Sequence, residues 1–350
     1  MTANYGNILV VNVNWVGDVI FSTPVFKALK RNFPEAKVWC LAAPRVKEIL
    51  ESCPFVDGII IYDEDGDHRG PLGKWRLIRQ IAEKKFDIAF LLHRSLTRAL
   101  LVFLTGIPKR VGYDEKGRGF LLTHKTKALD KDRVHRSDYY LNVIESFGIP
   151  VGDRMCELSV DGDCRLKIDD LLIRNGIAKN DKIIIINPGG NWDLKRWPKE
   201  NFATLLARMA VVGSERNADH GHARIVITGA KKDADLADSL LKLSGVRALV
   251  LTGVTTLKEL MALFERSSLV ISNDSGPLHI ANCVGTPAIA LFGPTRPEVT
   301  GPRGKGKFTV LQNDVGCNRS PCYFLGCPDN VCMKSITVDQ VINEIRRLQN

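Results

Sequence analysis

The chain has 350 residues, a hydrophobic fraction of 45%, a charged fraction of 25% and a formal net charge of +10. These values are typical of a globular protein with two domains of ordinary size. The apolar runs are shorter than the roughly 20 residues of a membrane-spanning helix, and residues 1–5 lack the basic and apolar regions of a signal peptide. We therefore expect a cytoplasmic protein.

The positive charge is spread along the chain and forms no arm of consecutive Lys and Arg. This distribution disfavours nucleic acid as a partner, because nucleic-acid sites usually need a dense basic patch. It suits an acidic substrate or contact with an anionic membrane face. The alternative is that the charge serves only solubility.

The first half of the chain alternates apolar strand patterns with helical patterns. Strands are predicted at 7–13, 37–42, 58–62 and 86–92, and helices at 18–31, 46–51, 75–83 and 96–104. Continuous apolar strands between helices are typical of a parallel sheet that is covered on both faces.

A second alternating series follows a polar connection near residues 150–180. Its strands are predicted at 182–187, 224–228, 247–251, 269–273 and 287–292, and its helices at 199–212, 231–243, 257–266 and 277–284. The two series predict an α/β protein with two doubly wound domains.

We place the first domain at 1–160 and the second at 161–335. The amphipathic helix within 336–350 is a candidate for packing back on the first domain. The polar segments 63–73 and 213–222 are predicted to be solvated loops, the second despite its two histidines.

The strongest signal for a ligand lies between two apolar strands, at residues 272–294. The first strand ends in Asp274-Ser275-Gly276, and a helix is predicted to begin near Pro277. A strand, a Gly-containing turn and a helix present backbone N–H groups and a positive helix end to an anion. Asp274 and Ser275 add a carboxylate and a hydroxyl, and His279 follows one helical turn later. The segment predicts a site for a phosphate-bearing ligand.

Other Gly-containing turns are expected at the same sheet edge. Gly189-Gly190 follows a buried strand, and Lys195 supplies a positive charge a few residues later. Thr228-Gly229 and Thr252-Gly253 end two further strands. Turns that combine Gly with small polar groups at one edge indicate a nucleotide pocket.

The first strand of the chain leads into a turn that ends in Gly17-Asp18. Ligands of doubly wound domains bind at the carboxyl ends of the strands, where Asp18 is predicted to lie. The alternative is that Asp18 caps a helix, although position 21 lacks the Glu or Gln of a capping box. The turn does not have the pattern GxGxxG, which disfavours a nicotinamide cofactor.

These motifs together resemble glycosyltransferase family 9, the heptosyltransferases of lipopolysaccharide core assembly. The matching segments are Gly17-Asp18, 187–189 with 195–198, and 273–279, within a likeness that runs from 7 to 345. The resemblance implies a GT-B fold, in which two Rossmann-like domains face each other across a cleft. The first would bind the acceptor and the second the nucleotide-sugar donor.

The resemblance also implies the reaction. Heptose would pass from an ADP-activated donor to the Kdo–lipid A inner core, or to a heptose already on it, with inversion at the anomeric carbon. Asp18 matches the general base, and Lys195 matches the residue that contacts donor phosphate. The matched donor loop holds the diphosphate and sugar through Asp274, Ser275, Gly276 and His279.

The remaining donor residues are assigned by position. Gly189 belongs to the matched segment, and Gly190 and Asn191 stand where some family members have hydroxyl residues. Thr255 falls near the nucleotide base or ribose. For the acidic acceptor our candidates are His93, Arg94 and Arg98, with Lys109-Arg110 weaker.

The mechanism expected from these residues needs neither a metal nor a cofactor. An inverting transfer requires a base that deprotonates the acceptor hydroxyl, a role that suits Asp18. Lys195 and the helix near Pro277 would meet the charge of the departing diphosphate. The expected partners are an ADP-sugar, the lipopolysaccharide inner core and, peripherally, the inner face of the cytoplasmic membrane.

Four of the nine cysteines, Cys317, Cys322, Cys327 and Cys332, recur at intervals of five residues near the C-terminus. Zinc ligands usually come as closer C-x2-C pairs. We expect reduced thiols that hold a loop near the donor site, with a structural zinc or iron–sulfur site as the alternative.

Two other functions stay open from sequence. One is a related transferase that uses another nucleotide sugar or another acceptor. The other is a non-catalytic module that binds a nucleotide, or a metal through the four cysteines.

Overall fold

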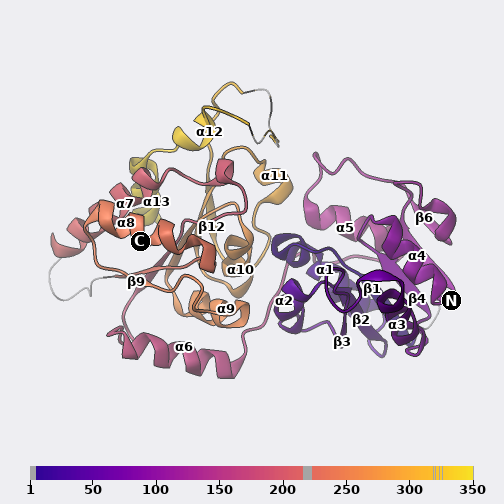
Figure 1. Cartoon of the computed structure of the whole chain (residues 1–350). Helices are drawn as coiled ribbons and strands as arrows, with labels where there is room; N and C mark the ends of the chain where they lie inside the picture. The colour runs from indigo at the N-terminus through magenta and orange to yellow at the C-terminus, as the bar shows by residue number, and fades with distance from the viewer. Residues whose placement is uncertain are drawn as a thin grey trace. The chain divides into compact units, whose positions relative to one another are not determined.

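The computed structural model describes residues 5–215, 223–317, 319, 321, 322, 324 and 326–349. The chain divides into two compact units, Met1–Ser159 and Val160–Asn350 (Figure 1). Each unit consists of a parallel six-stranded sheet and the helices that connect its strands. Among the described residues, no helix has both the length and the apolar character needed to cross a bilayer.

The first unit contains a sheet of order β3-β2-β1-β4-β5-β6. Its strands are β1 (Asn7–Val11), β2 (Lys37–Ala42), β3 (Gly58–Ile61), β4 (Ile88–Leu91), β5 (Lys109–Tyr113) and β6 (His124–Thr126). Its helices are α1 (Val16–Asn32), η1 (Pro44–Val46), α2 (Lys47–Glu51), α3 (Gly70–Ala82), α4 (Leu96–Leu104), η2 (Gly119–Leu121) and α5 (Arg136–Glu145).

The second unit contains a sheet of order β12-β11-β10-β7-β8-β9. Its strands are β7 (Ile183–Asn187), β8 (Arg224–Ile227), β9 (Leu249–Val250), β10 (Leu269–Asn273), β11 (Ala288–Leu291) and β12 (Phe308–Leu311). Its helices are α6 (Gly162–Arg174), η3 (Asp193–Lys195), α7 (Lys199–Glu215), η5 (Lys231–Asp233), α8 (Ala234–Ser244), α9 (Leu257–Arg266), α10 (Gly276–Val284), α11 (Pro297–Thr300), α12 (Val331–Lys334) and α13 (Val338–Gln349).

Both sheets have the same topology when their strands are counted from the start of each unit. The order is 3-2-1-4-5-6 in each, and the neighbouring strands pair in parallel. The direction of winding reverses between β1 and β4 in the first unit and between β7 and β10 in the second. Open α/β sheets bind ligands at the carboxyl ends of the strands beside this reversal.

The central strands are buried on both faces, which explains their continuous apolar sequences. In β7 the residues Ile183–Ile186 are at most 2% exposed, and β10 begins with the buried Leu269, Val270 and Ile271. The β-branched side chains of these strands suit a pleated surface that is packed from both sides. The core therefore holds rigid the two strands that lead into the predicted donor loops.

The alternation of strands and helices is confirmed, and the strands 37–42 and 269–273 and the helices 96–104 and 257–266 have the predicted bounds. The strand predicted at 247–251 is shorter: β9 covers Leu249–Val250 and lies at the edge of the sheet, beside β8.

The segment 63–73 is only partly a loop, because α3 begins at Gly70. In the other predicted loop, 213–222, residues 216–222, including both histidines, lie outside the described part of the chain.

Helix α13 packs within the second unit. Its buried residues Val341, Ile342 and Ile345 share a core cluster with residues of β7, α7 and β10. The Trp197 indole N–H donates to the Ile336 carbonyl just before the helix, at 2.9 Å. These contacts bury the apolar face of α13 in the second unit, and contact of the helix with the first domain stays a prediction.

We expect the substitution Ile345→Ala to destabilise the second unit by about 2–4 kcal/mol, because it leaves a cavity in the core. The matched control is Arg346→Ala, since Arg346 is exposed on the same helix. Urea unfolding followed by tryptophan fluorescence measures the difference. Equal stability of the two variants would contradict the packing of α13 described above.

Candidate functional site

The predicted site residues lie at the two reversal points of the sheets. In the first unit Asp18 follows β1 and His93 follows β4. In the second unit Gly189 follows β7 and Asp274 follows β10. Each pair of strands is adjacent, so the residues that follow them gather at one edge of each sheet. We describe the two groups separately.

Asp274 is the centre of the group in the second unit. Its side chain is 4% exposed, and its Oδ2 lies 2.6 Å from Lys195 Nζ. The Thr295 hydroxyl donates to the same oxygen at 2.7 Å, and His279 Nε2 lies 3.6 Å from Oδ1. Burial opposes ionisation, but the hydrogen bond from His279 and the charge of Lys195 hold the pKa of Asp274 well below its usual range.

This arrangement suits Asp274 to positioning Lys195 rather than to contacting a phosphate directly. An ionised carboxylate repels a phosphate, whereas it orients the ammonium group beside it. The Lys195 ammonium also lies 5.2 Å from the centre of the Trp192 ring. Lys195 is therefore the group that can meet an anion, and Asp274 sets its position.

Asn273 joins the loop after β7 to the end of β10. Its fully buried amide donates to the carbonyls of Pro188 and Gly189 at 2.8 and 3.1 Å. Its Oδ1 accepts from the Trp197 backbone N–H at 3.0 Å. The sequence assigned no role to Asn273. These three bonds hold both ends of the segment that carries Lys195.

Gly189 approaches a second buried carboxylate, Asp233. A Cβ atom at Gly189 would lie 2.7 Å from Asp233 Oδ2, a distance too short for real Cβ atoms. Asp233 accepts from the backbone N–H of Ala230 at 2.9 Å. The sequence analysis missed Asp233, although an acidic residue three positions after a turn residue is a typical helix-start pattern.

Gly190 and Asn191 continue the same loop. The Arg196 guanidinium donates to the Gly190 carbonyl at 2.7 Å, and so closes the loop on itself. Asn191 is exposed. Thr255 follows β9, an edge strand of this sheet, and directly precedes Thr256, the N-cap of α9.

The N-terminus of α10 completes the group around Asp274. The helix begins at Gly276, and its N-cap Ser275 forms no side-chain capping bond. Ser275 Oγ instead lies 3.3 Å from Ser272 Oγ. The N-terminal end of a helix carries a partial positive charge. Pro277 has no N–H and the Leu278 N–H donates to the Ser275 carbonyl at 3.1 Å, so Gly276 carries the first N–H that this helix start can offer. Together with Lys195, it forms a site suited to an anion.

Asp18 is the centre of the group in the first unit. Helix α1 begins at Val16 with Trp15 as its N-cap, so the alternative that Asp18 is the cap is wrong. Asp18 Oδ1 accepts from the Tyr140 hydroxyl at 2.9 Å and lies 3.7 Å from Arg136 Nε. Both partners belong to α5. The Asp18 side chain is 33% exposed, so it can still contact a ligand.

Tyr140 acts as a donor to Asp18. Burial and the adjacent Asp18 carboxylate raise the pKa of Tyr140 well above its ordinary value, so the hydroxyl keeps its proton. The sequence analysis missed Tyr140 and Arg136, because Tyr140 is 122 residues away from Asp18 and no local pattern joins them.

His93 is neutral at physiological pH. Burial and the nearby cations, Arg98, Arg118, Lys116 and Arg94, lower its pKa to about 3. Its Nδ1 accepts from the Ser95 backbone N–H at 3.1 Å, which assigns the ring proton to Nε2. His93 can therefore donate a neutral hydrogen bond to an acceptor, but it adds no charge.

The two arginines predicted beside His93 differ. Arg98 has no exposed side-chain surface, and it donates to the Asn12 carbonyl at 3.0 Å. Its burial argues against the predicted contact with a ligand; it supports the turn after β1 instead. Arg94 is 32% exposed and lies 3.3 Å from Glu115, and it stays a candidate for contact with an anionic ligand.

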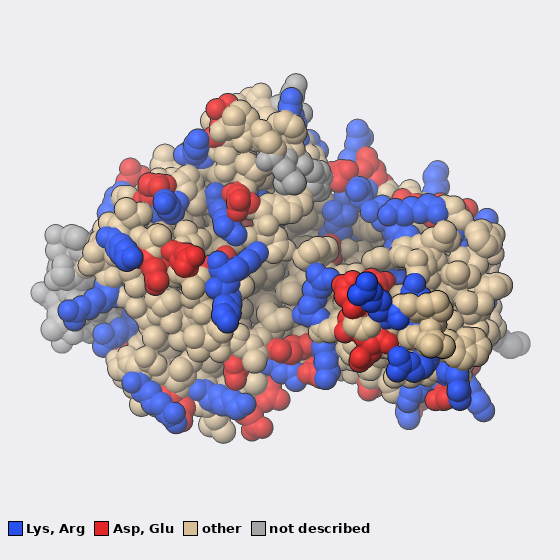
Figure 2. Space-filling model, in the orientation of Figure 1, with Lys and Arg blue, Asp and Glu red and all other residues tan. Residues whose placement is uncertain are grey.

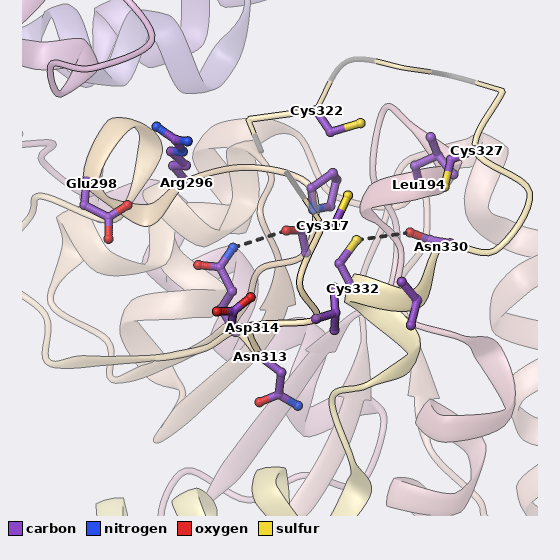
Figure 3. Close-up of a pocket in the computed structure, with 15 residues that line it drawn as sticks. Leu194, Arg296, Glu298, Asn313, Asp314, Cys317, Cys322, Cys327, Asn330 and Cys332 are labelled. Carbon is purple, nitrogen blue, oxygen red and sulfur yellow. Dashed lines mark hydrogen bonds between the residues drawn. The ribbon is translucent and has the colours of Figure 1, made fainter. Parts of the chain in front are cut away.

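The four C-terminal cysteines line one cavity of about 380 Å³, together with Leu194 and Arg296 (Figure 3). All four are free cysteines. Burial and the neighbouring thiols Cys327 and Cys317 raise the pKa of Cys332. In the part of the chain that the structure describes, no three His, Cys, Asp or Glu side chains form a group that could hold a metal ion. Leu194 joins this cavity to the loop that carries Lys195.

Comparison with protein families gives one clear match. A model described as glycosyltransferase family 9 (heptosyltransferase) matches residues 74–324. Lipopolysaccharide heptosyltransferase 2 of Salmonella typhimurium is 27% identical over 315 residues, which cover 84% of this chain and 85% of the relative. Lipooligosaccharide heptosyltransferase 2 of Haemophilus influenzae is 28% identical over 329 residues, which cover 87% and 88%.

Solved structures show the same fold over the whole chain. A glycosyl transferase family 9 protein from Veillonella parvula has a TM-score of 0.84 and 23% identity, and the match covers 99% of this chain and 98% of that one. The E. coli ADP-heptose lps heptosyltransferase II has a TM-score of 0.77 and 24% identity, with 98% of both chains covered.

We expect Gly189→Ala to lower stability by about 1–3 kcal/mol, because the added methyl group would overlap Asp233. Gly190→Ala is the matched control: its Cβ would lie 3.5 Å from Arg196 Cγ, an ordinary contact. Thermal unfolding of the two variants measures the difference. If Gly190→Ala is the more damaging, the close approach of Gly189 to Asp233 is not what holds this loop.

His93 should make stability depend on pH. The unfolded chain takes up this proton near pH 6.5, but the folded one only near pH 3. The unfolded state thus binds more protons in this window, and His93 makes stability fall as the pH drops. We expect His93→Asn to lose less stability than the wild type between pH 6.5 and 4.5, measured by urea unfolding. The same loss in both proteins would contradict a neutral His93.

Proposed function

The chain belongs to glycosyltransferase family 9, and we propose that it transfers heptose from ADP-heptose to the inner core of a lipopolysaccharide. Its two doubly wound units are those of the GT-B fold. The family model and the curated relatives make it a glycosyltransferase. The names of the relatives support heptose and a lipopolysaccharide or lipooligosaccharide acceptor. The name of the E. coli heptosyltransferase II supports ADP-heptose as the donor.

The observation that carries the proposal is the position of Lys195 beside the N-terminus of α10. When the glycosidic bond of the donor breaks, negative charge grows on the departing diphosphate. The Lys195 ammonium, the Gly276 N–H at the start of α10 and the Ser275 hydroxyl are donors that can meet this charge. Because Asp274 and Asn273 fix this arrangement in advance, little reorganisation accompanies the reaction. We infer that these groups make the transfer independent of metal.

Asp18 is proposed as the general base on the acceptor side. Inversion requires a base that removes the proton of the acceptor hydroxyl as this oxygen attacks the anomeric carbon. Both Tyr140 and Arg136 contact Oδ1 of Asp18, which leaves Oδ2 to receive the proton. Their second effect is to fix the direction in which the carboxylate points.

The acceptor proposed here carries acidic groups and a lipid anchor. Arg94 offers a partly exposed cation at the end of β4, and His93 a neutral donor beside it. Arg98 would act only indirectly, through the turn that it supports. Because lipid A is a membrane lipid, we propose that the enzyme works at the inner face of the cytoplasmic membrane and contacts it peripherally.

We expect Asp18→Asn to lower kcat by about 10²–10⁴-fold, since the amide cannot accept the proton. ADP binding should be unchanged, because Asp18 belongs to the first unit and the donor residues to the second. The assay follows release of ADP from ADP-heptose with Kdo–lipid A or heptosyl-Kdo–lipid A as acceptor. Asp65→Asn, at an exposed carboxylate of the same unit, is the control.

Two results would count against this proposal. Near-normal turnover by Asp18→Asn would contradict the role of Asp18 as the base but not the proposed substrates. Turnover by the wild type with UDP- or GDP-sugars, and none with ADP-heptose, would move the protein to another substrate within the family.

A further inference from the structure

Helix α4 is apolar on both its buried and its exposed sides. Ala99, Leu101 and Val102 pack in the core of the first unit. The opposite side carries large apolar side chains that are 43–53% exposed: Leu96, Leu100, Phe103 and Leu104. Their spacing of four, three and one places them on one face of the helix. A second apolar face on a helix whose first face is already buried indicates a further contact.

Neighbouring elements extend this apolar face. Leu72 and Trp75 of α3 are 79% and 58% exposed, and Phe120 of η2 is 75% exposed. Both elements contact α4, and the buried sides of all three share one core cluster. They therefore cover the same face of the sheet as one layer. We call its outer surface the α3–α4 face: Leu72, Trp75, Leu96, Leu100, Phe103, Leu104 and Phe120.

Positive charge accompanies the α3–α4 face. Helix α3 carries Lys74, Arg76 and Arg79, and neither α3 nor α4 contains an Asp or a Glu. The Arg110 guanidinium lies 5.1 Å from the centre of the Phe103 ring. The acidic residues nearest in sequence are Glu83, the C-cap of α3, and those in the turn 63–67 before the helix. In Figure 2 the surface over α4 is mostly tan, with Lys and Arg and some Asp and Glu at its edges.

We propose that the α3–α4 face docks the protein on a bilayer that contains anionic lipids. Apolar and aromatic side chains next to Lys and Arg are what such an interface accommodates, because the apolar groups enter the acyl boundary and the cations meet the headgroups. The proposal rests on the proposed function, which gives the acceptor a lipid anchor. Ser95, the N-cap of α4, directly follows Arg94, so the face starts beside the candidate acceptor residues.

The test is flotation of the full chain with vesicles of phosphatidylcholine alone and of phosphatidylcholine with phosphatidylglycerol. We expect the wild type to bind the anionic vesicles and salt to weaken the binding. The double variant Leu100→Ser/Phe103→Ser should bind about tenfold more weakly or worse, since two large apolar side chains no longer insert. Leu166→Ser/Ile173→Ser is the matched control, because it removes two exposed apolar side chains of α6.

Three results would overturn the proposal. The first is a wild type that binds neither kind of vesicle. The second is equal vesicle binding by the two double variants. The third is a concentration-dependent dimer, detected by sedimentation velocity, that Leu100→Ser/Phe103→Ser abolishes while vesicle binding stays intact; the face would then join two copies of this chain.

A transfer assay with a delipidated acceptor separates this proposal from the proposed function. We expect Leu100→Ser/Phe103→Ser to retain wild-type turnover on that acceptor, because the substituted residues are on the outer side of α4. If the wild type binds anionic vesicles but transfers no heptose, the proposed docking surface stands and the proposed reaction is wrong.

Discussion

The buried, ionised carboxylate of Asp274 is the interaction on which the proposed donor site depends. A buried carboxylate is costly unless charges and hydrogen bonds compensate it. Here Lys195, Thr295 and His279 surround it, and this restricts each of them to one orientation. Asn273, one residue earlier, holds the loop that brings Lys195 to the carboxylate. The position of the Lys195 ammonium is thus set by the residues that follow the adjacent strands β7 and β10.

The first unit also holds a carboxylate, Asp18, at the corresponding place in its fold. Its sheet has the same strand order, and Asp18 follows the strand that corresponds to β7 of the second unit. Asp18 is held by Tyr140 and Arg136, but it stays partly exposed, as the proposed role of a base requires. Helix α4 then has two tasks. Its buried Arg98 supports the turn after β1, and its outer face offers the surface proposed for the bilayer.

Much of the fold could be predicted from sequence, since strands such as 183–187 are buried on both sides and read as unbroken apolar runs. The residues after those strands could be predicted too, because parallel strands end at one edge. Tyr140 could not, because its link to Asp18 depends on the packing of α5 on α1. Arg98 reads as a surface charge, and only the structure shows that Asn12 and Tyr62 enclose it. The sequence of an amphipathic helix such as α13 does not show which surface the helix packs against.

The central claim is that Asp274 acts through Lys195, and ADP binding measured by calorimetry tests it most directly. The proteins needed are the wild type, Lys195→Met, Asp274→Asn and the double variant, with UDP and GDP as comparison ligands. The account predicts selective ADP binding, weaker binding by each single variant, and a double variant no weaker than Lys195→Met. Additive losses, or tighter ADP binding by Asp274→Asn, would contradict it.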